Sequence, residues 1–308
     1  MKEVEDCFSK VKNNYLKFLK KEKIFIKSKK IKINNLKKNY IPISFWIEKK
    51  YKEKRKTLFL GFSGSQGSGK TTITSILKII LKTFFKRDVC VVSIDNFYKT
   101  FNERRKMAKK IHPLFETRGV PGTHDITLLK KFLINIKKNK FKRFKIPKFD
   151  KSEDDRMKSK HWSKIKKRPE IVILEGWCVG AIPQSNSLLK KPVNVLESKY
   201  DKKFKWRKYV NQKLKNEYKK VFSMIDYYIF MKVPNFRMVF KWRLLQEKKL
   251  KKMSRPNKKI MTYDQIKRFV MFYQRITLQM IKDLSKSASI VMLLKKNQEI
   301  KKLLFKTK

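Results

Sequence analysis

The sequence feature that most constrains the fold is a glycine-rich segment between an apolar run and an amphipathic one. The segment reads GSQGSGKT over Gly64–Thr71, after the apolar residues 58–62 and before a helical pattern at 73–80. Three glycines allow a tight turn whose successive N–H groups point at an anion, and the following helix adds the partial positive charge of its N-terminus. A strand, loop and helix in this order predict a loop that binds the phosphates of a nucleotide, whereas a chance glycine-rich turn is the alternative.

The side chains of this loop have distinct expected roles. Lys70 is expected to reach the β- and γ-phosphates, and the Thr71 hydroxyl is expected to bind Mg²⁺. The predicted nucleotide-binding residues are Gly64, Ser65, Gln66, Gly67, Ser68, Gly69, Lys70, Thr71 and Thr72.

Apolar runs without polar alternation recur along the chain and are typical of parallel strands covered on both faces. The predicted strands are Leu58–Phe62, Val89–Ile94, Ile171–Leu174, Tyr227–Val233 and Ile290–Leu294. Helical patterns separate these runs, which predicts a three-layer α/β domain of the P-loop NTPase type with a mainly parallel five-stranded sheet.

We expect three further segments around this sheet. Residues 1–55 read as a lysine-rich helical lead-in that Pro42 interrupts, followed by the nucleotide-binding domain at 56–308. Within that domain, a substrate-binding insertion is expected at about 96–168 and a lid at about 236–262.

The formal net charge is +57, from 82 Lys and Arg against 25 Asp and Glu. The charge is spread along the whole chain and is mostly lysine, which fits a codon bias of the genome as well as nonspecific binding to polyanions. Three cysteines without metal-ligand spacing support neither a disulfide framework nor a zinc site. No secretory signal or apolar run of ~20 residues is visible, so we expect a soluble cytoplasmic protein, monomeric or dimeric, without a membrane partner.

Two carboxylates close predicted strands, at the edge of the sheet where ligands gather in open α/β folds. Asp95 follows the second strand and is the expected base or acceptor-positioning residue, and also a metal ligand. Glu175 follows the third strand and is expected to organise Mg²⁺ and its waters. A strand-end cap without a catalytic part is the alternative for each.

Several motifs of unusual composition occur in one order from about residue 40 to about 285. They read SIDNFY at 93–98, HPL at 112–114, RGVPGTHD at 118–125, IPKFDKS at 146–152 and EGWCVG at 175–180, and continue with NVLE at 194–197, WRKYVN at 206–211 and WRLLQE at 242–247. With them the chain resembles the D-glycerate 3-kinase family, within the larger phosphoribulokinase/uridine kinase group.

The resemblance implies transfer of the γ-phosphate of MgATP to a hydroxyl of a small acidic acceptor, D-glycerate in the characterised members, giving 3-phosphoglycerate. ATP and Mg²⁺ are the implied cofactors, with a small molecule as the partner. A uridine or pantothenate kinase of the same group and a nucleic-acid-binding P-loop ATPase are the alternative functions.

The acceptor site is expected in the insertion, where an arginine fork, a histidine and a glycine-rich backbone can hold a carboxylate. The predicted substrate-binding residues are Asp95, Tyr98, Arg118, His124, Asp125, Asp150, Lys151 and Arg156. The pair His124 and Asp125 also fits the N-terminus of a helix at 126–134, and Lys151 and Arg156 also fit a solvated charge cluster. The family's glycine-containing stretch between its D-K-S and D-R segments is shortened here to Ser152-Glu153-Asp154-Asp155.

A helix predicted at 236–250 carries Arg243, the expected counter-charge for the transition state in a lid. The segment SRPNK at 254–258 is expected to form the tip of that lid. The alternative for Arg243 is a structural pair with Glu247, four residues on. Trp177 and Trp242 are expected to pack in the core and not to stack on a base.

Overall fold

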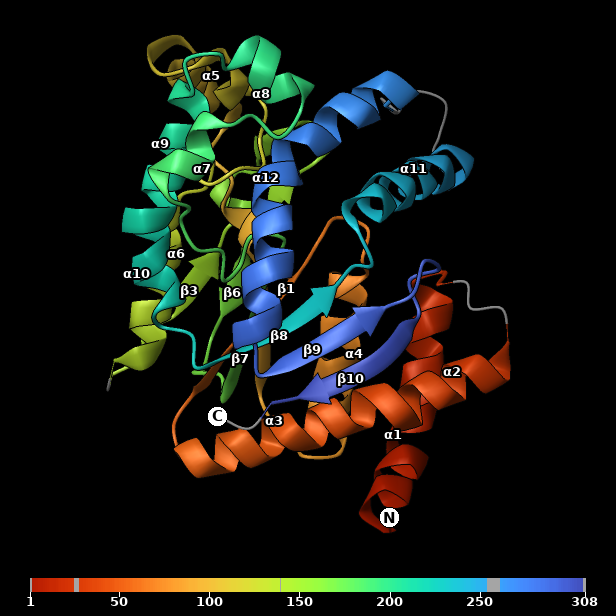
Figure 1. Cartoon of the computed structure of the whole chain (residues 1–308). Helices are drawn as coiled ribbons and strands as arrows, with labels where there is room; N and C mark the ends of the chain where they lie inside the picture. The colour runs from red at the N-terminus through yellow and green to blue at the C-terminus, as the bar shows by residue number, and fades with distance from the viewer. Residues whose placement is uncertain (1, 25–27, 139, 254–260, 307–308) are drawn as a thin grey trace.

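A six-stranded sheet forms the centre of the molecule, and its strands follow the order β10-β9-β8-β1-β7-β2 (Figure 1). The computed structural model describes residues 2–24, 28–138, 140–253 and 261–306. The strands are β1 (Leu58–Gly64), β2 (Val89–Ser93), β7 (Ile171–Gly176), β8 (Tyr227–Lys232), β9 (Ile290–Leu294) and β10 (Ile300–Phe305). All neighbouring pairs are parallel except β9 with β10, which are antiparallel.

The mainly parallel α/β fold is confirmed, and each of the five predicted runs forms a strand of the sheet. The edge strand β10 was not predicted. Its segment IKKLLF includes Lys301 and Lys302 and none of its residues is buried, as suits an antiparallel edge strand that leaves much of its surface in water.

One face of the sheet is covered by α4 (Lys70–Thr83) and by the N-terminal helices α1 (Lys2–Lys21) and α3 (Ile41–Lys54). Leu58, Leu60 and Phe62 of β1 share one apolar cluster with residues of these helices, such as Ile47 and Ile76. The lead-in is therefore part of the layer on that face (Figure 1).

The lead-in is helical, but Pro42 does not interrupt it. A helix α2 (Lys29–Asn35) runs through a π-helical turn at Leu36–Tyr40 directly into α3, where Pro42 lies in the first turn. Proline is tolerated there because the N–H groups of the first turn have no partner within the helix.

The opposite face carries α6 (Ile126–Lys137), α9 (Lys205–Lys213), α10 (Lys219–Phe222) and α12 (Tyr263–Ser287). Phe59 of β1 packs into this second cluster, since alternate residues of a strand point to opposite faces. Figure 1 shows α12 crossing in front of the sheet and α4 behind it. These faces make the three layers of the fold.

The segment between β2 and β7 is the predicted insertion. It contains α5 (Phe101–Lys110), α6, β3 (Phe144–Ile146), β4 (Phe149–Asp150), β5 (Asp155–Arg156), β6 (Ser163–Ile165) and the 3₁₀ turns Ile94–Phe97, Pro113–Glu116 and Ser159–His161. Strands β3 and β6 pair with each other, as do β4 and β5.

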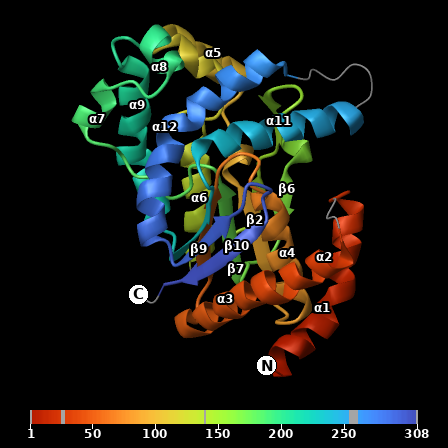
Figure 2. The same ribbon diagram turned by 45° about the vertical axis from the view of Figure 1, so that its right-hand side comes forward.

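Two helical segments, one after β7 and one after β8, lie around the carboxyl ends of the strands. The first contains α7 (Asn186–Lys190), α8 (Val195–Tyr200), α9, a π-helical turn at Leu214–Tyr218, and α10. The second begins with α11 (Phe236–Met253), which corresponds to the helix predicted at 236–250 and lies beside α12 in Figure 2. The predicted lid tip at 254–258 lies outside the described residues.

None of the helices in the described ranges has both the length and the apolar composition of a membrane span.

Candidate active site

The loop between β1 and α4 has a backbone conformation that favours glycine at two positions. Gly67 and Gly69 have φ angles of +75° and +93°, in the left-handed region. A Cβ on Gly67 would lie 2.8 Å from the Cβ of Trp242 in α11, and the Gly67 carbonyl accepts a hydrogen bond from Gln298 Nε2 at 2.6 Å. The loop is therefore fixed from two other segments, and Trp242 is a packing residue, 1% exposed.

Lys70 begins α4 and points along the loop. Its Nζ donates to the carbonyl of Ser65 at 2.9 Å. Burial lowers the pKa of Lys70, and the nearby carboxylates of Glu175 and Asp95 partly oppose that change. The ammonium thus lies between the loop and both strand-end carboxylates.

Thr71 and Glu175 meet at the ends of α4 and β7. The Thr71 hydroxyl donates to Glu175 Oε1 at 3.1 Å, and burial raises the pKa of Glu175 against the opposing effect of Lys70. These oxygens suit Mg²⁺, a hard cation. Among the described residues there is no group of three or more His, Cys, Asp and Glu that could hold a metal.

Asp95 lies just after β2 and pairs with Lys151, whose Nζ is 2.8 Å from Oδ2. Burial alone would raise the pKa of Asp95, but Lys151 and Lys70 hold it well below its usual range. Asp95 is therefore a carboxylate at neutral pH and an acceptor for a proton.

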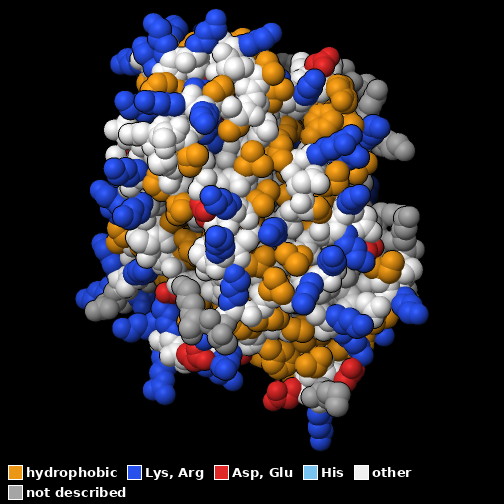
Figure 3. Space-filling model, in the orientation of Figure 1, with side chains coloured by type: hydrophobic (Ala, Val, Ile, Leu, Met, Phe, Trp, Pro, Cys, Tyr) orange, Lys and Arg blue, Asp and Glu red, His pale blue; other side chains and the backbone are white. Residues whose placement is uncertain are grey.

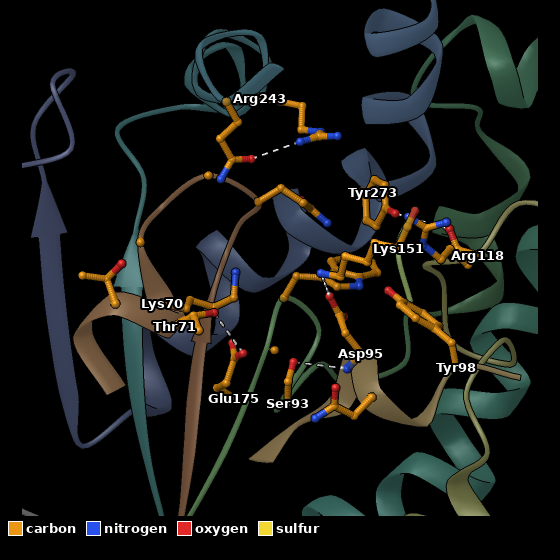
Figure 4. A pocket seen from close by; sticks show the side chains of 18 of the residues that line it. Lys70, Thr71, Ser93, Asp95, Tyr98, Arg118, Lys151, Glu175, Arg243 and Tyr273 are labelled. Carbon is orange, nitrogen blue, oxygen red and sulfur yellow. Dashed lines mark hydrogen bonds and ion pairs between the residues drawn. The ribbon is translucent and has the colours of Figure 1, made fainter. Parts of the chain in front are cut away.

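These groups surround one cavity of about 410 Å³ at the carboxyl ends of the strands (Figure 4). From the predicted site, the lining contains Gln66, Gly67, Gly69, Lys70, Thr71, Thr72, Asp95, Tyr98, Arg118, Lys151, Glu175 and Arg243. The structure thus brings the glycine-rich loop, the strand-end carboxylates and the positively charged side chains together from segments up to 177 residues apart in the sequence, counted from Gln66 to Arg243.

The end of the cavity away from the loop is formed by the insertion and α12. Arg118 and Tyr98 lie there, next to Tyr273 (Figure 4). The Tyr273 hydroxyl donates to the Arg118 carbonyl at 3.3 Å. This end combines a guanidinium with two phenol rings, a surface suited to a small anion.

His124 was predicted to bind substrate, but it does not line the cavity. Its side chain is buried under Tyr98, with ring centroids 4.4 Å apart, and Nδ1 lies 2.6 Å from the Tyr218 hydroxyl. Burial lowers the pKa of His124 to about 4, so the imidazole is neutral at pH 7. In this structure it supports the Tyr98 ring.

Asp125, Asp150 and Arg156 are likewise absent from the cavity wall. Asp125 caps α6 by accepting from Leu128 N at 3.0 Å, as the alternative interpretation had it, and it pairs with Arg156 at 3.4 Å. Arg156 also donates to the Tyr98 carbonyl at 2.8 Å, while Asp150 accepts from the backbone N–H of Ser152 at 2.8 Å. These three groups hold the loops of the insertion.

The ion pair with Glu247 that was the alternative for Arg243 is present, and the role of Arg243 in the transition state stays a prediction. Arg243 forms this ion pair within α11, and it also lines the cavity with its side chain 18% exposed. Its Nε is buried with no hydrogen-bond partner among the described residues. Arg243 is thus held by Glu247 while facing the cavity.

Several lining residues were not predicted as part of the site. They are Ser93, Asn96, Gly176, Trp177, Gln246, Phe269 and Tyr273. The first four lie in the motifs around Asp95 and Glu175. Their closeness in sequence to a predicted site residue is a signal that could have identified them. Trp177 is buried as expected, but its Nε1 donates to the Gly119 carbonyl at 3.0 Å behind Arg118. Phe269 and Tyr273 belong to a long amphipathic helix, and nothing in its pattern marks them.

Residues 59–207 match the family model of the phosphoribulokinase/uridine kinase family. The protein named "Uncharacterized kinase mug58" of Schizosaccharomyces pombe is 35% identical over 213 residues, covering 67% of this chain and 76% of that protein. The chloroplastic D-glycerate 3-kinase of Arabidopsis thaliana is 29% identical over 225 residues, covering 68% of this chain and 47% of that protein.

A solved structure of D-glycerate 3-kinase from Cryptococcus neoformans shares the fold. The TM-score is 0.74 at 23% identity, and the match covers 86% of this chain and 98% of that one. The sequence matches confirm the family resemblance that the motifs indicated, and this structure shows the same fold.

Proposed function

This chain belongs to the phosphoribulokinase/uridine kinase family of P-loop kinases, and on that premise we propose that it phosphorylates D-glycerate to 3-phosphoglycerate with MgATP. A relative that is named D-glycerate 3-kinase supports this choice of acceptor. The motifs of the insertion and of 175–180 support it over uridine or pantothenate.

The observation that carries the proposal is the arrangement of Lys70, Asp95 and Arg118 around one cavity. A phosphate-binding lysine lies at one end, an ionised carboxylate in between, and a guanidinium at the other end. A molecule with a hydroxyl and a carboxylate matches this order of charges, because the hydroxyl meets Asp95 when the carboxylate meets Arg118.

In the proposed mechanism the loop N–H groups and Lys70 bind the β- and γ-phosphates of ATP. Thr71 and Glu175 would hold Mg²⁺, which when bound neutralises charge on the phosphate oxygens. Asp95 orients the acceptor hydroxyl and accepts its proton as the oxygen bonds to the γ-phosphorus and ADP leaves. Arg243 faces the phosphates with a positive charge, which stabilises the transition state.

The direct test measures ADP release from MgATP with and without D-glycerate. We expect glycerate-dependent release that falls about 100-fold or more in Lys70→Ala and in Asp95→Asn, because each removes an interaction with the transferring group. Lys158→Ala and Asp6→Asn, which change charges outside the cavity, are the matched controls and are expected to keep full activity.

A panel of acceptors separates the possible outcomes. Release that depends on uridine or pantothenate but not on glycerate would overturn the acceptor and leave the reaction class standing. If no acceptor stimulates release while a nucleic acid does, the chain is a nucleic-acid-dependent ATPase and the proposed function is wrong.

A further inference from the structure

A wholly buried guanidinium lies behind the acceptor end of the cavity, and the mechanism above does not use it. Arg104 of α5 has 0% exposure. Its N–H groups donate to the carbonyl oxygens of Lys99 at 3.3 Å, Glu116 at 2.6 Å and Asp154 at 2.5 Å. A buried cation is stable only with such partners, so Arg104 fixes three loops of the insertion relative to one another.

The carboxylate of Asp154 lies between Arg104 and a second arginine. Its Oδ2 is 3.0 Å from Nη2 of Arg104, and its Oδ1 forms an ion pair with Nη1 of Arg118. The Arg118 guanidinium also lies over the ring of Phe149, 5.4 Å from its centroid. Arg118 is thereby held on two sides while it faces the cavity.

The backbone at Asp154 is part of this arrangement. Its φ is +56°, in the left-handed region that glycine enters most easily and that Asp enters more readily than most residues. Asp154 is therefore a position where glycine can replace the side chain without straining the turn.

One turn of four residues, 151–154, connects Asp95, the proposed base, to Arg118. Lys151 at its start pairs with Asp95, and Asp154 at its end pairs with Arg118. The turn therefore sets how far the Asp95 carboxylate lies from the Arg118 guanidinium. Because two guanidinium groups share one carboxylate in the Arg104, Asp154 and Arg118 cluster, Asp154 does not fully cancel the positive charge of Arg118, which lines the cavity.

We propose that Asp154 is a positioning residue that aims Arg118 at the carboxylate of the acceptor and so selects hydroxy acids over neutral alcohols. The inference rests on the proposed function, since it assumes an acceptor that carries a carboxylate. Asp154 acts through Arg118 and does not touch the acceptor. Its removal therefore weakens acceptor binding and leaves ATP binding intact.

Steady-state kinetics of two variants test the assignment. In Asp154→Gly, which removes the carboxylate and relaxes the turn, the KM for D-glycerate is expected to rise about 10- to 100-fold, as for one lost charge-assisted hydrogen bond. The KM for ATP is expected to stay within about 2-fold of the wild-type value, because the substitution does not touch the phosphate loop, residues Gly64–Thr71. Preference for D-glycerate over glycerol, which lacks the carboxylate, falls in parallel.

Asp154→Asn keeps the side-chain oxygen but loses the charge. Its KM for D-glycerate is therefore expected to lie between the values of the wild type and of Asp154→Gly. Glu153→Gln removes an exposed carboxylate from the same turn and is the matched control. Its KM values for D-glycerate and for ATP are expected to equal those of the wild type. An unchanged acceptor KM in Asp154→Gly, or an equal rise in both KM values, would overturn the proposal.

A second measurement does not depend on the acceptor. Labelling with phenylglyoxal, followed by mass spectrometry of the Arg118 peptide, is expected to be at least about 5-fold faster in Asp154→Gly than in the wild type, because the ion pair no longer shields the guanidinium. Equal rates would show that Asp154 does not hold Arg118. If the wild type phosphorylates no hydroxy acid, the proposed function fails by itself, and the labelling still decides whether Asp154 positions Arg118.

Discussion

At the scale of single residues, the ion pair of Lys151 with Asp95 determines when the proposed base is available. The 2.8 Å contact holds the pKa of Asp95 well below its usual range even though burial acts to raise it. Lowering the pKa keeps Asp95 ionised but also weakens it as a base. The ion pair therefore makes Asp95 a weaker base but keeps its carboxylate ionised at mildly acidic pH.

The pH dependence of Lys151→Met tests this role. Without the ammonium the pKa of Asp95 rises toward its normal value or above it, so the acid limb of kcat/KM against pH is expected to move up by about 1–2 pH units. The sign follows because activity needs the carboxylate, which is lost as pH falls through its pKa. Lys158→Met is the control. A lower rate with an unmoved acid limb would show that Lys151 does not control the ionisation of Asp95.

The residues of the site were predictable where a short motif carries the chemistry. Lys70, Thr71, Asp95 and Glu175 follow from one loop and two strand ends, and all four line the cavity. The burial of Arg104 was not predictable, because a basic residue in the segment ERRKMAKK resembles an exposed helix surface. Its partners are carbonyl oxygens of distant loops, which leave no trace in the local pattern.

At the scale of secondary-structure elements, α11 connects the phosphate loop to the cavity. Trp242 of α11 packs against Gly67, and the next residue, Arg243, lines the cavity. Any shift of α11 therefore moves a loop contact and a catalytic candidate together. The same helix carries Glu247, which is 5% exposed and pairs with Arg243.

A double substitution separates the structural role of Arg243 from its proposed catalytic role. Arg243→Met removes the cation that pairs with the buried Glu247 carboxylate, which keeps a hydrogen bond from the Met261 N–H, so we expect a loss of about 3 kcal/mol in unfolding free energy and about 10³-fold in kcat. Adding Glu247→Gln is expected to restore most of the stability but not the activity. Urea unfolding and kcat measure the two effects, with Lys10→Met as a surface ion-pair control. Recovery of kcat in the double variant would assign Arg243 a structural role only.

Elements were predictable in proportion to how fully they are buried. Strands β1, β2, β7, β8 and β9 are runs of apolar residues, and the sequence shows them as such. Strand β10 and the two-residue strands β4 and β5 depend on tertiary pairing and were missed. The position of Pro42 was misjudged because a first-turn proline and a helix-breaking proline look alike in sequence.

At the scale of the whole molecule, positive charge is spread along the chain and over the face that Figure 3 shows. Figure 3 shows lysine and arginine side chains scattered over the visible face among apolar and neutral atoms. The formal charge of +57 nevertheless creates a field that attracts any polyanion. A scattered distribution favours attraction without a preferred sequence or structure.

A salt titration tests this expectation. We expect weak binding to RNA or DNA at ~50 mM salt that falls by a factor on the order of 10³ by ~200 mM, with a linear dependence of log K on log salt and no preference among sequences. Fluorescence anisotropy with unrelated oligonucleotides measures the binding. Binding that survives ~200 mM salt and prefers one sequence would instead indicate a dedicated nucleic-acid interface.

The hydrogen bond from Gln298 to the Gly67 carbonyl spans 231 positions of the chain. As a ribosome releases the polypeptide, β1 and the loop emerge early, whereas Gln298 follows only after β9. Nascent chains that already contain the complete GSQGSGKT segment would therefore still lack one of the contacts that shape it. Tight nucleotide capture is then a late event in biosynthesis, and ATP can serve as a ligand that reports the completed fold.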